Sequence, residues 1–169
     1  MTITINGSGT VTGITAGGLP DAIITQPELA TGVAGTGPAF SAVLSANQSV
    51  TSSVTTKLAF ATEEFDTNSN YDTSNYRFTP TVAGYYQVTV NIEPAISQAY
   101  QYVYIYKNGS AAKRNSSGSS SGTGTIVTAT ISMNGSTDYL EAYTLIPSTG
   151  NISSTSQGTY FQAAMVRGA

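Results

Sequence analysis

The chain has 169 residues, of which 9% are charged, and its formal net charge at pH 7 is -3. It contains no Cys and no His, which excludes disulfides and thiolate metal sites and removes the commonest metal ligand and general base. Six Lys and Arg residues against nine Asp and Glu argue against nucleic-acid binding through phosphate contacts. We therefore expect no enzyme, no metal site and no cofactor.

The composition favours β-strands and turns over helices. Thr, Val, Ile and Tyr suit a pleated, half-buried surface, whereas the abundant Gly, Ser and Asn residues prefer turns. No stretch near 18 residues is continuously apolar, and no charged and then apolar leader opens the chain. We expect one all-β domain that is made in a cytoplasm and does not insert into a membrane.

The first 37 residues form a segment of a different kind. Every Phe and Tyr lies at or after Phe40, so residues 1–37 have no aromatic side chain with which to close a core. Gly-rich stretches separate a few apolar side chains, which we expect to dock on another protein. We predict an extended anchoring arm over residues 1–37 and a compact domain over residues 38–169, with Ile3, Ile5, Leu19, Ile23 and Ile24 as the anchoring side chains.

From Phe40 onward, apolar residues recur at every second position, which is typical of half-buried antiparallel strands. The Asn134-Gly135 pair stands between two such runs and predicts a hairpin. The apolar positions of the expected strands are Phe40, Ala42, Leu44 and Ala46, then Leu58 and Phe60, Tyr86 to Ile92, Val127 to Met133, residues 139–145, and finally Tyr160 to Val166.

One strand presents two faces that are both suited to burial. Its even positions are Tyr100, Tyr102, Tyr104 and Tyr106, and its odd positions include Val103 and Ile105. In a two-sheet sandwich one of these faces lies outside the core and requires a partner. Tyrosines offer a large contact area and a hydroxyl, as interfaces favour. We predict a subunit contact through the four tyrosines; the alternative is an outer strand with solvated tyrosines.

Several motifs in a fixed order resemble the C1q-like domain, a relative of tumour necrosis factor. They are Ala-Phe-Ser-Ala at 39–42, the block from Asn70 to Pro80, Ala-Gly-Tyr-Tyr at 83–86, residues 103–109, residues 133–139 and Thr-Tyr-Phe at 159–161. The resemblance covers about residues 38–169 and implies a ten-stranded antiparallel jelly-roll sandwich that assembles as a compact homotrimer. The collagen-like stem of many members is missing.

The arm resembles a second group of proteins. Residues 7–21 and 30–38 look like segments of structural proteins from tailed bacteriophages. Together the two resemblances imply a virion protein: a trimeric tail-fibre knob, held to other virion proteins by residues 1–37, that contacts the host surface. A head or tail decoration or adaptor protein with a purely structural role is the alternative, and a cleaving enzyme on the tail is a third reading.

The expected topology sorts the loops between the two ends of the sandwich. Loops 93–99, 115–123 and 145–157 share the end away from the C-terminus, whereas the turns at Asn108-Gly109 and Asn134-Gly135 lie at the C-terminal end. The far end faces outward if the arm anchors the chain. Its side chains then contact a host glycan or an outer-membrane protein, unless the loops are merely solvated; the candidates are Gln98, Tyr100, Asn115, Asn151 and Gln157.

The sequence offers few groups for chemistry. Glu63, Glu64 and Asp66 form the one acidic cluster, but neighbours along a strand point to opposite faces, which fits neither a calcium loop nor a glycosidase pair. Asp72 lies in a turn-rich stretch, where capping explains it. The serines of Gly-Ser-Ser-Ser-Gly at 118–122 lack a His base and are interpreted as loop.

Overall fold

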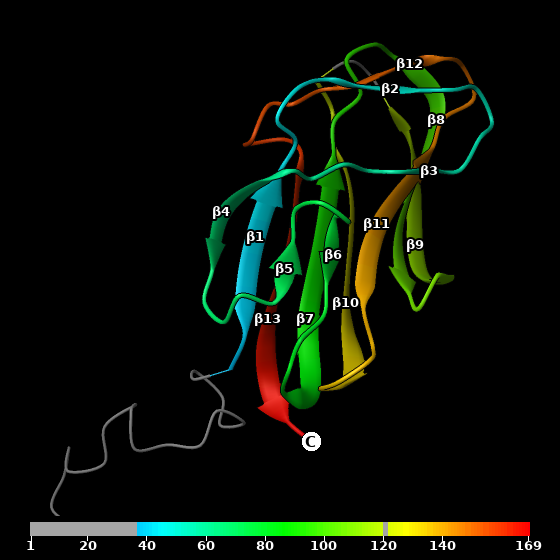
Figure 1. Cartoon of the computed structure of the whole chain (residues 1–169). Coiled ribbons are helices and arrows are strands. Elements are labelled where there is room, and N and C mark those ends of the chain that lie inside the picture. Colours follow the sequence, from blue (N-terminus) through cyan, green and yellow to red (C-terminus); the bar gives the residue numbers. More distant parts are fainter. Residues whose placement is uncertain (1–36, 120–121) are drawn as a thin grey trace, which may run out of the picture. The chain divides into compact units, whose positions relative to one another are not determined.

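The computed structural model describes residues 37–119 and 122–169, and every regular element within them is a strand (Figure 1). No helix in this part of the chain has the length and hydrophobicity to cross a membrane. The strands are β1 (Ala39–Val43), β2 (Gln48–Val50), β3 (Thr56–Lys57), β4 (Thr62–Asp66), β5 (Tyr71–Asp72), β6 (Arg77–Phe78), β7 (Ala83–Ile92), β8 (Gln98–Lys107), β9 (Ser110–Ser119), β10 (Thr125–Asn134), β11 (Leu140–Leu145), β12 (Gly150–Ile152) and β13 (Tyr160–Gly168).

The strands form two facing sheets and a short third one. A five-stranded sheet has the order β10-β7-β13-β1-β4, and a six-stranded sheet has the order β5-β6-β11-β8-β9 with β3 also paired to β11. The pair β12-β2 lies across the upper end in Figure 1. Every pairing is antiparallel. The fold is an antiparallel jelly-roll sandwich, which confirms the fold class predicted from the sequence.

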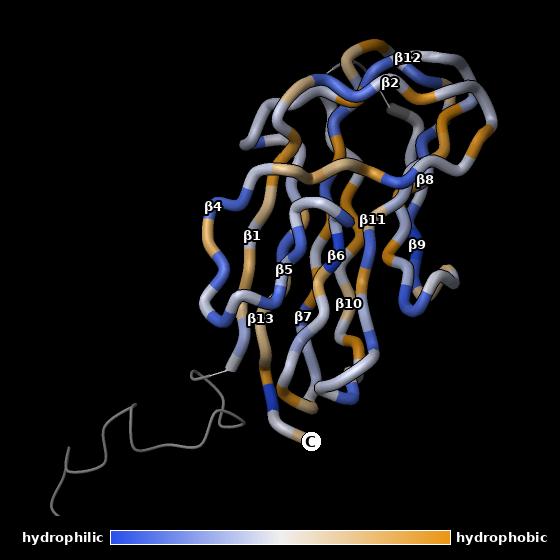
Figure 2. Tube along the Cα trace, in the orientation of Figure 1, coloured by the Kyte–Doolittle hydropathy of each residue, from blue (hydrophilic) through white to orange (hydrophobic). Residues whose placement is uncertain are grey.

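The core lies between the two sheets and follows the predicted alternation. On β7 the residues Tyr86, Val88, Val90 and Ile92 are fully buried, while the residues between them face outward. Figure 2 shows the same alternation of hydrophobic and hydrophilic positions along the long strands. This period of two is what a sheet with one buried face requires.

Aromatic rings centred on Phe40 of β1 join the strands at the middle of the core. Its ring centroid lies 4.5 Å from that of Phe78, 4.6 Å from that of Tyr71 and 4.9 Å from that of Phe161. The Tyr71 hydroxyl donates to the Phe60 carbonyl at 2.8 Å, and burial raises the pKa of Tyr71. Burial likewise raises the pKa of Tyr86 to about 12, so both phenols remain protonated donors at neutral pH.

Two predicted strands have different bounds in the structure. The first ends at Val43, and Ala46 is exposed rather than inward-facing. Leu58 and Phe60 are fully buried as expected, but they follow the two-residue strand β3 instead of forming a strand themselves. The Nε2 and Oε1 atoms of Gln48 bond Lys57 O and Ala59 N, each at 2.8 Å. This side chain occupies backbone groups that a regular ladder would otherwise use.

The two Asn-Gly pairs behave differently. Asn108-Gly109 closes a two-residue hairpin between β8 and β9, with φ values of 52° and 75°. Both angles are positive, as the favoured hairpin turns require. Asn134-Gly135 does not form a hairpin, because β10 and β11 belong to different sheets. There the Asn134 Oδ1 atom accepts hydrogen bonds from three successive amides, those of residues 136–138, and turns the chain across the sandwich.

The expected sorting of the loops between the two ends is seen in Figure 1, but two loops are shorter than expected, because β8 begins at Gln98 and β9 runs to Ser119. The loops around β2 and β12 lie at the end away from the C-terminus, and the turns that follow β8 and β10 lie at the C-terminal end. The compact domain thus presents two sheet faces and one loop-covered end as surfaces for partners. The predicted division into an arm over 1–37 and a domain over 38–169 stays a prediction, since residues 1–36 lie outside the described part.

Candidate interaction surfaces

Acidic side chains near β4 accept hydrogen bonds from nearby groups. Glu64 accepts from the Ser41 hydroxyl at 2.7 Å, and Asp66 accepts from the amides of Asn68 and Tyr71 at 3.2 and 2.7 Å. Three amide and side-chain donors from Ser74 and Asn75 likewise bond Asp72 and lower its pKa, the Asn75 side chain having the largest effect. Among the described residues, no group of three acidic or other ligating side chains is arranged to hold a metal ion.

The outer face of the five-stranded sheet has no charged side chain on β10, β7 and β13 as far as Val166, and Arg167 borders it near the C-terminus. We call it the uncharged face. At its centre Thr89 of β7 lies opposite Thr128 of β10 and Gln162 of β13, and the pairing of β13 with β7 shifts register between Met165 and Arg167. Three of its side chains are large, apolar and exposed, namely Tyr85, Ile126 and Val166 at 44%, 44% and 47%. Its members are Tyr85, Gln87, Thr89 and Asn91, then Ile126, Thr128, Thr130 and Ser132, and then Tyr160, Gln162, Ala164 and Val166.

Hydrogen bonds within the uncharged face hold its polar side chains in place. The hydroxyls of Thr89 and Thr128 are 2.9 Å apart, and Gln87 Nε2 donates to Thr128 Oγ1 at 2.8 Å. The Thr130 hydroxyl donates to Gln87 Oε1 at 3.0 Å. A partner therefore meets a largely pre-ordered surface, which lowers the entropy cost of association.

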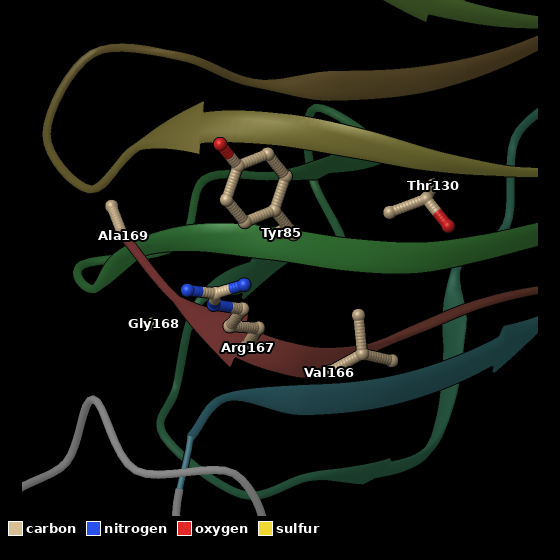
Figure 3. Close-up of a pocket in the computed structure, with 6 residues that line it drawn as sticks. All are labelled: Tyr85, Thr130, Val166, Arg167, Gly168 and Ala169. Carbon is tan, nitrogen blue, oxygen red and sulfur yellow. The ribbon is translucent and has the colours of Figure 1, made fainter.

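Near the C-terminus the uncharged face is hollowed. Figure 3 shows Tyr85, Thr130 and Val166 projecting from three neighbouring strands around this hollow, which also borders Arg167 and measures about 420 Å³. A second hollow of about 240 Å³ lies between Phe65, Gln87 and Gln162. Phe65 is 51% exposed at the edge strand β4, so the apolar character extends to that edge.

The predicted tyrosines lie together on the outer face of the six-stranded sheet. Ring centroids of Tyr100 and Tyr102 are 5.3 Å apart, those of Tyr102 and Tyr104 are 6.1 Å apart, and those of Tyr104 and Tyr106 are 5.9 Å apart. Tyr143 of β11 extends the row, because its ring stacks on Tyr106 at 4.1 Å. We call this surface, with Arg114 of β9, the tyrosine face. The guanidinium carbon of Arg114 lies 5.0 Å from the Tyr102 ring centroid.

A charged cluster borders the tyrosine face at Glu141. Lys57 Nζ lies 2.6 Å and Arg77 Nη2 lies 3.0 Å from Glu141 Oε1. Burial of the Glu141 carboxyl raises its pKa, but the hydrogen bonds and charges of Lys57 and Arg77 outweigh burial, and the pKa lies below its ordinary value. Arg77 also covers the Tyr139 ring at 3.7 Å. The negative charge of Glu141 is thus neutralised within the protein.

The receptor candidates other than Tyr100 are in different surroundings. Asn151 and Gln157 are exposed at the loop end. Asn115 lies in the middle of β9 rather than in a loop, and its Nδ2 donates to Ile126 O at 2.7 Å. Gln98 is buried at 6% exposure, so the expectation that it faces a partner at the surface is not met. The anchoring candidates Ile3, Ile5, Leu19, Ile23 and Ile24 lie outside the described residues.

Gln98 is buried at the first position of β8, where its amide group lies close to Gly150 of β12. Neither amide atom of Gln98, nor Nε2 of the buried Gln101, has a hydrogen-bond partner among the described residues. Sequence reasoning placed Gln98 in a loop, whereas it occupies the first position of the strand. It also missed the uncharged face, whose signal was the absence of any charge at alternate positions from 85 to 91.

The chain also matches proteins of known family. A model of the C1q domain matches residues 39–133, which is more than half of the chain. The chain belongs to the C1q domain family. This confirms the resemblance to the C1q-like domain that the sequence motifs indicate. No curated protein sequence matches the chain.

Solved structures share the fold of this C1q domain at low sequence identity. Murine APRIL in crystals at pH 8.5 has a TM-score of 0.60 at 8% identity, over 76% of this chain and 98% of its own. The globular domain of zebrafish complement 1qA has a TM-score of 0.54 at 12% identity, over 78% and 99%. The PRD1 vertex protein P5 has a TM-score of 0.60 at 16% identity, over 77% and 97%. The likeness concerns the fold alone.

Proposed function

We propose that the chain is a bacteriophage virion protein whose C1q domain assembles as a homotrimer and is displayed as a knob at a tail-fibre tip. Residues 1–37 attach it to other virion proteins. Synthesis takes place in the host cytoplasm and the mature location is the virion. The fold shared with a vertex protein of PRD1 supports this setting, as does the resemblance of residues 7–21 and 30–38 to tailed-phage proteins.

The uncharged face is the main structural support for the proposed homotrimer. Exposed surfaces of a soluble domain usually mix charges of both signs, whereas the members of this face are all uncharged, include the exposed Tyr85, Ile126 and Val166, and have Arg167 only at their C-terminal border. Depletion of charge with retained aromatic and apolar area is characteristic of the buried part of a subunit contact. We propose that subunits associate through this face.

The tyrosine face is the alternative subunit contact and remains the prediction made from the sequence. Its rings are apolar, but Arg114 lies among them, and Lys57, Arg77 and Glu141 border them. Taking a free guanidinium out of water without an anionic partner is costly. On the uncharged face the guanidinium of Arg167 lies at the C-terminal border, whereas Arg114 lies among the rings of the tyrosine face, and for that reason we favour the uncharged face.

A head or tail decoration or adaptor protein with a purely structural role is the second candidate function. It uses the same trimer and the same arm, but the loop end then caps the particle without binding a host. The exposed Asn151 and Gln157 favour host contact, because both lie at the end away from the C-terminus. We do not propose an enzyme.

Two measurements test the proposal. Immunogold labelling of purified particles with antibodies against the C1q domain is expected to mark the tips of the tail fibres. Label on the head or along the tail would favour the decoration or adaptor role, and an absence of the protein from particles would refute a virion function. Light scattering of the purified chain is expected to give three times the chain mass of 17.4 kDa.

A further inference from the structure

The tyrosine face forms a continuous row of rings. Four tyrosines at alternate positions of β8 span about 20 Å, given a rise of about 3.3 Å per residue. Neighbouring centroids along β8 are 5.3 to 6.1 Å apart, and Tyr143 continues the row on β11. Each ring packs against the next, so a ligand that binds along the row immobilises few additional side chains.

The hydroxyls of this row are available to a ligand. Within the described residues, those of Tyr100, Tyr102, Tyr104 and Tyr106 make no hydrogen bond, in contrast to the hydroxyls of Tyr71 and Tyr86, which donate to backbone carbonyls at 2.8 Å. The rings are half-buried and the hydroxyl ends reach water. A row of this kind combines apolar ring faces with hydrogen-bonding groups.

One positive charge on the tyrosine face is not neutralised. The ion pairs among the described residues join Lys57 and Arg77 to Glu141 and Lys107 to Asp138, so none of them includes Arg114. The Glu141 carboxylate is already paired with Lys57 and Arg77. Asp72 lies on β5, which is three strands away from β8. A ligand on the row therefore meets a cation and no free carboxylate nearby.

Sugar rings fit this combination of groups. The C–H bonds of a pyranose ring are positively polarised and pack on the negative face of an aromatic ring, while its hydroxyls bond phenol and serine hydroxyls. Ser116 lies opposite Tyr102 on β9 and is exposed beside the row. A carboxylate on the sugar would pair with the planar guanidinium of Arg114.

We propose that the tyrosine face binds a polysaccharide that contains uronic acid, with sugar rings on Tyr102, Tyr104 and Tyr106 and a uronate carboxylate on Arg114. This inference rests on the proposed function, because it names the chemistry of the host partner. It places a host contact on the side of the knob, in addition to the one proposed at its loop end. Nucleic acid is a poorer fit, since one free cation cannot match a phosphate on every nucleotide.

Titration calorimetry of the full-length trimer with polygalacturonate, alginate and hyaluronan tests the proposal. The chain has no Trp, so quenching of tyrosine emission serves as a second readout of stacking. Binding to at least one uronate polymer is expected, with dextran as the neutral polymer that does not bind. Failure of all three polymers to bind, or equal binding of dextran, overturns the proposal.

Three variants locate the site. Arg114→Gln and Tyr104→Ala are each expected to weaken binding about tenfold, which is the loss of one charge-assisted contact or of one stacked ring. Lys113→Gln is the matched control, because Lys113 lies in register with the inward-facing Ile105 and points away from the row. It is expected to change affinity less than about twofold. Wild-type affinity in Arg114→Gln overturns the proposal.

The calorimetric result does not depend on where the protein lies on the particle. A trimer that dissociates in Tyr104→Ala identifies the tyrosine face as the subunit contact and overturns the glycan site. Immunogold label away from the fibre tips refutes host attachment but leaves a measured uronate affinity standing. If the label lies at the fibre tips and no uronate polymer binds, the polysaccharide site is refuted and the proposed function stands.

Discussion

Lys57 Nζ lies 2.6 Å from Glu141 Oε1 and joins β3 to β11, which are 84 residues apart in the chain. The Glu141 side chain is 4% exposed, although it lies on the outer face of its sheet, because Lys57, Arg77 and Tyr143 surround it. A carboxylate enclosed in this way requires its cations, since removing a charge from water without a partner is costly.

The substitution Glu141→Gln is expected to lower the free energy of unfolding at pH 7 by about 2 kcal/mol, because it leaves two partly buried cations without their anion. Urea denaturation followed by circular dichroism measures the change. Asp72→Asn is a suitable control for loss of an exposed carboxylate and is expected to have a smaller effect. An unchanged urea midpoint in Glu141→Gln would show that this cluster does not stabilise the fold.

The same pair gives a pH dependence of definite sign. The folded pKa of Glu141 lies below its ordinary value of 4.5, so its contribution is complete above pH 4.5 and is lost as the pH falls through the folded pKa. Wild-type stability is therefore expected to fall below pH 4.5 more steeply than that of Glu141→Gln. The urea midpoints of the wild type and of Glu141→Gln should converge at low pH. Parallel curves would contradict the lowered pKa.

Gly135→Ala is expected to destabilise the domain by more than about 2 kcal/mol. The residue has φ of 70°, and a Cβ atom would clash with the Ala83 amide nitrogen, which is part of the backbone and cannot rotate away. Gly109→Ala is the matched control: it has φ of 75°, but its Cβ would meet only the Tyr139 hydroxyl at 3.4 Å. Its expected cost is about 1 kcal/mol from strain alone. Thermal denaturation distinguishes the two, and equal costs would refute the steric argument.

Phe40→Ala is expected to cost about 3–5 kcal/mol, because its ring contacts those of Phe78, Tyr71 and Phe161 at the centre of the core. Phe65→Ala removes the same group from a position that is 51% exposed and should cost less than about 1 kcal/mol. Chemical denaturation of both variants provides the comparison. A large loss in Phe65→Ala would mean that this ring is buried in the assembly.

Thr89→Lys places a charge in the middle of the uncharged face, between Thr128 and Gln162, and is expected to convert the trimer into monomers. Sedimentation velocity measures the mass in solution. Ser148→Lys adds the same charge to an exposed loop position and should leave the trimer intact. If Thr89→Lys stays trimeric and Tyr104→Lys dissociates, the subunit contact lies on the tyrosine face, as the sequence predicted.

Alanine at both Asn151 and Gln157 is expected to reduce adsorption of particles to host cells if the loop end also contacts the receptor. Residual free phage after mixing with host cells measures adsorption. Arg114→Gln in the same assay separates a contact at the loop end from one on the tyrosine face. Wild-type adsorption of the Asn151 and Gln157 double variant would remove the loop end from the receptor site.

Alternation was enough to predict the interior of the long strands, because a sheet with one buried face repeats every two residues. It correctly placed Val88 and Val90 on one face of β7 and Val103 and Ile105 on the inward face of β8. Local sequence patterns did not predict the structure correctly where the pairing of distant strands determines it. The same Asn-Gly dipeptide closes a hairpin at Asn108 but leads from one sheet to the other at Asn134.

Surfaces were harder to predict than the core for a physical reason. Exposure of Gln98 depends on the loop that folds over it, and no local pattern records that loop. The uncharged face requires three strands that are distant in the chain to align, so that Thr89, Thr128 and Gln162 become neighbours. The tyrosine row could be predicted because it lies on one strand, whereas Arg114 joins it only through the pairing of β9 with β8.

Within the described residues, strand β9 ends the six-stranded sheet and its backbone pairs only with β8, while the Asn115 side chain reaches across to Ile126 of β10. A strand edge without a backbone partner can recruit strands from other molecules and lead to aggregation when many copies are crowded together. The adjacent charges of Lys113 and Arg114, near the register shift between Ile105 and Tyr106, oppose such pairing. The guanidinium that we assign to ligand binding thus also helps to keep the protein soluble.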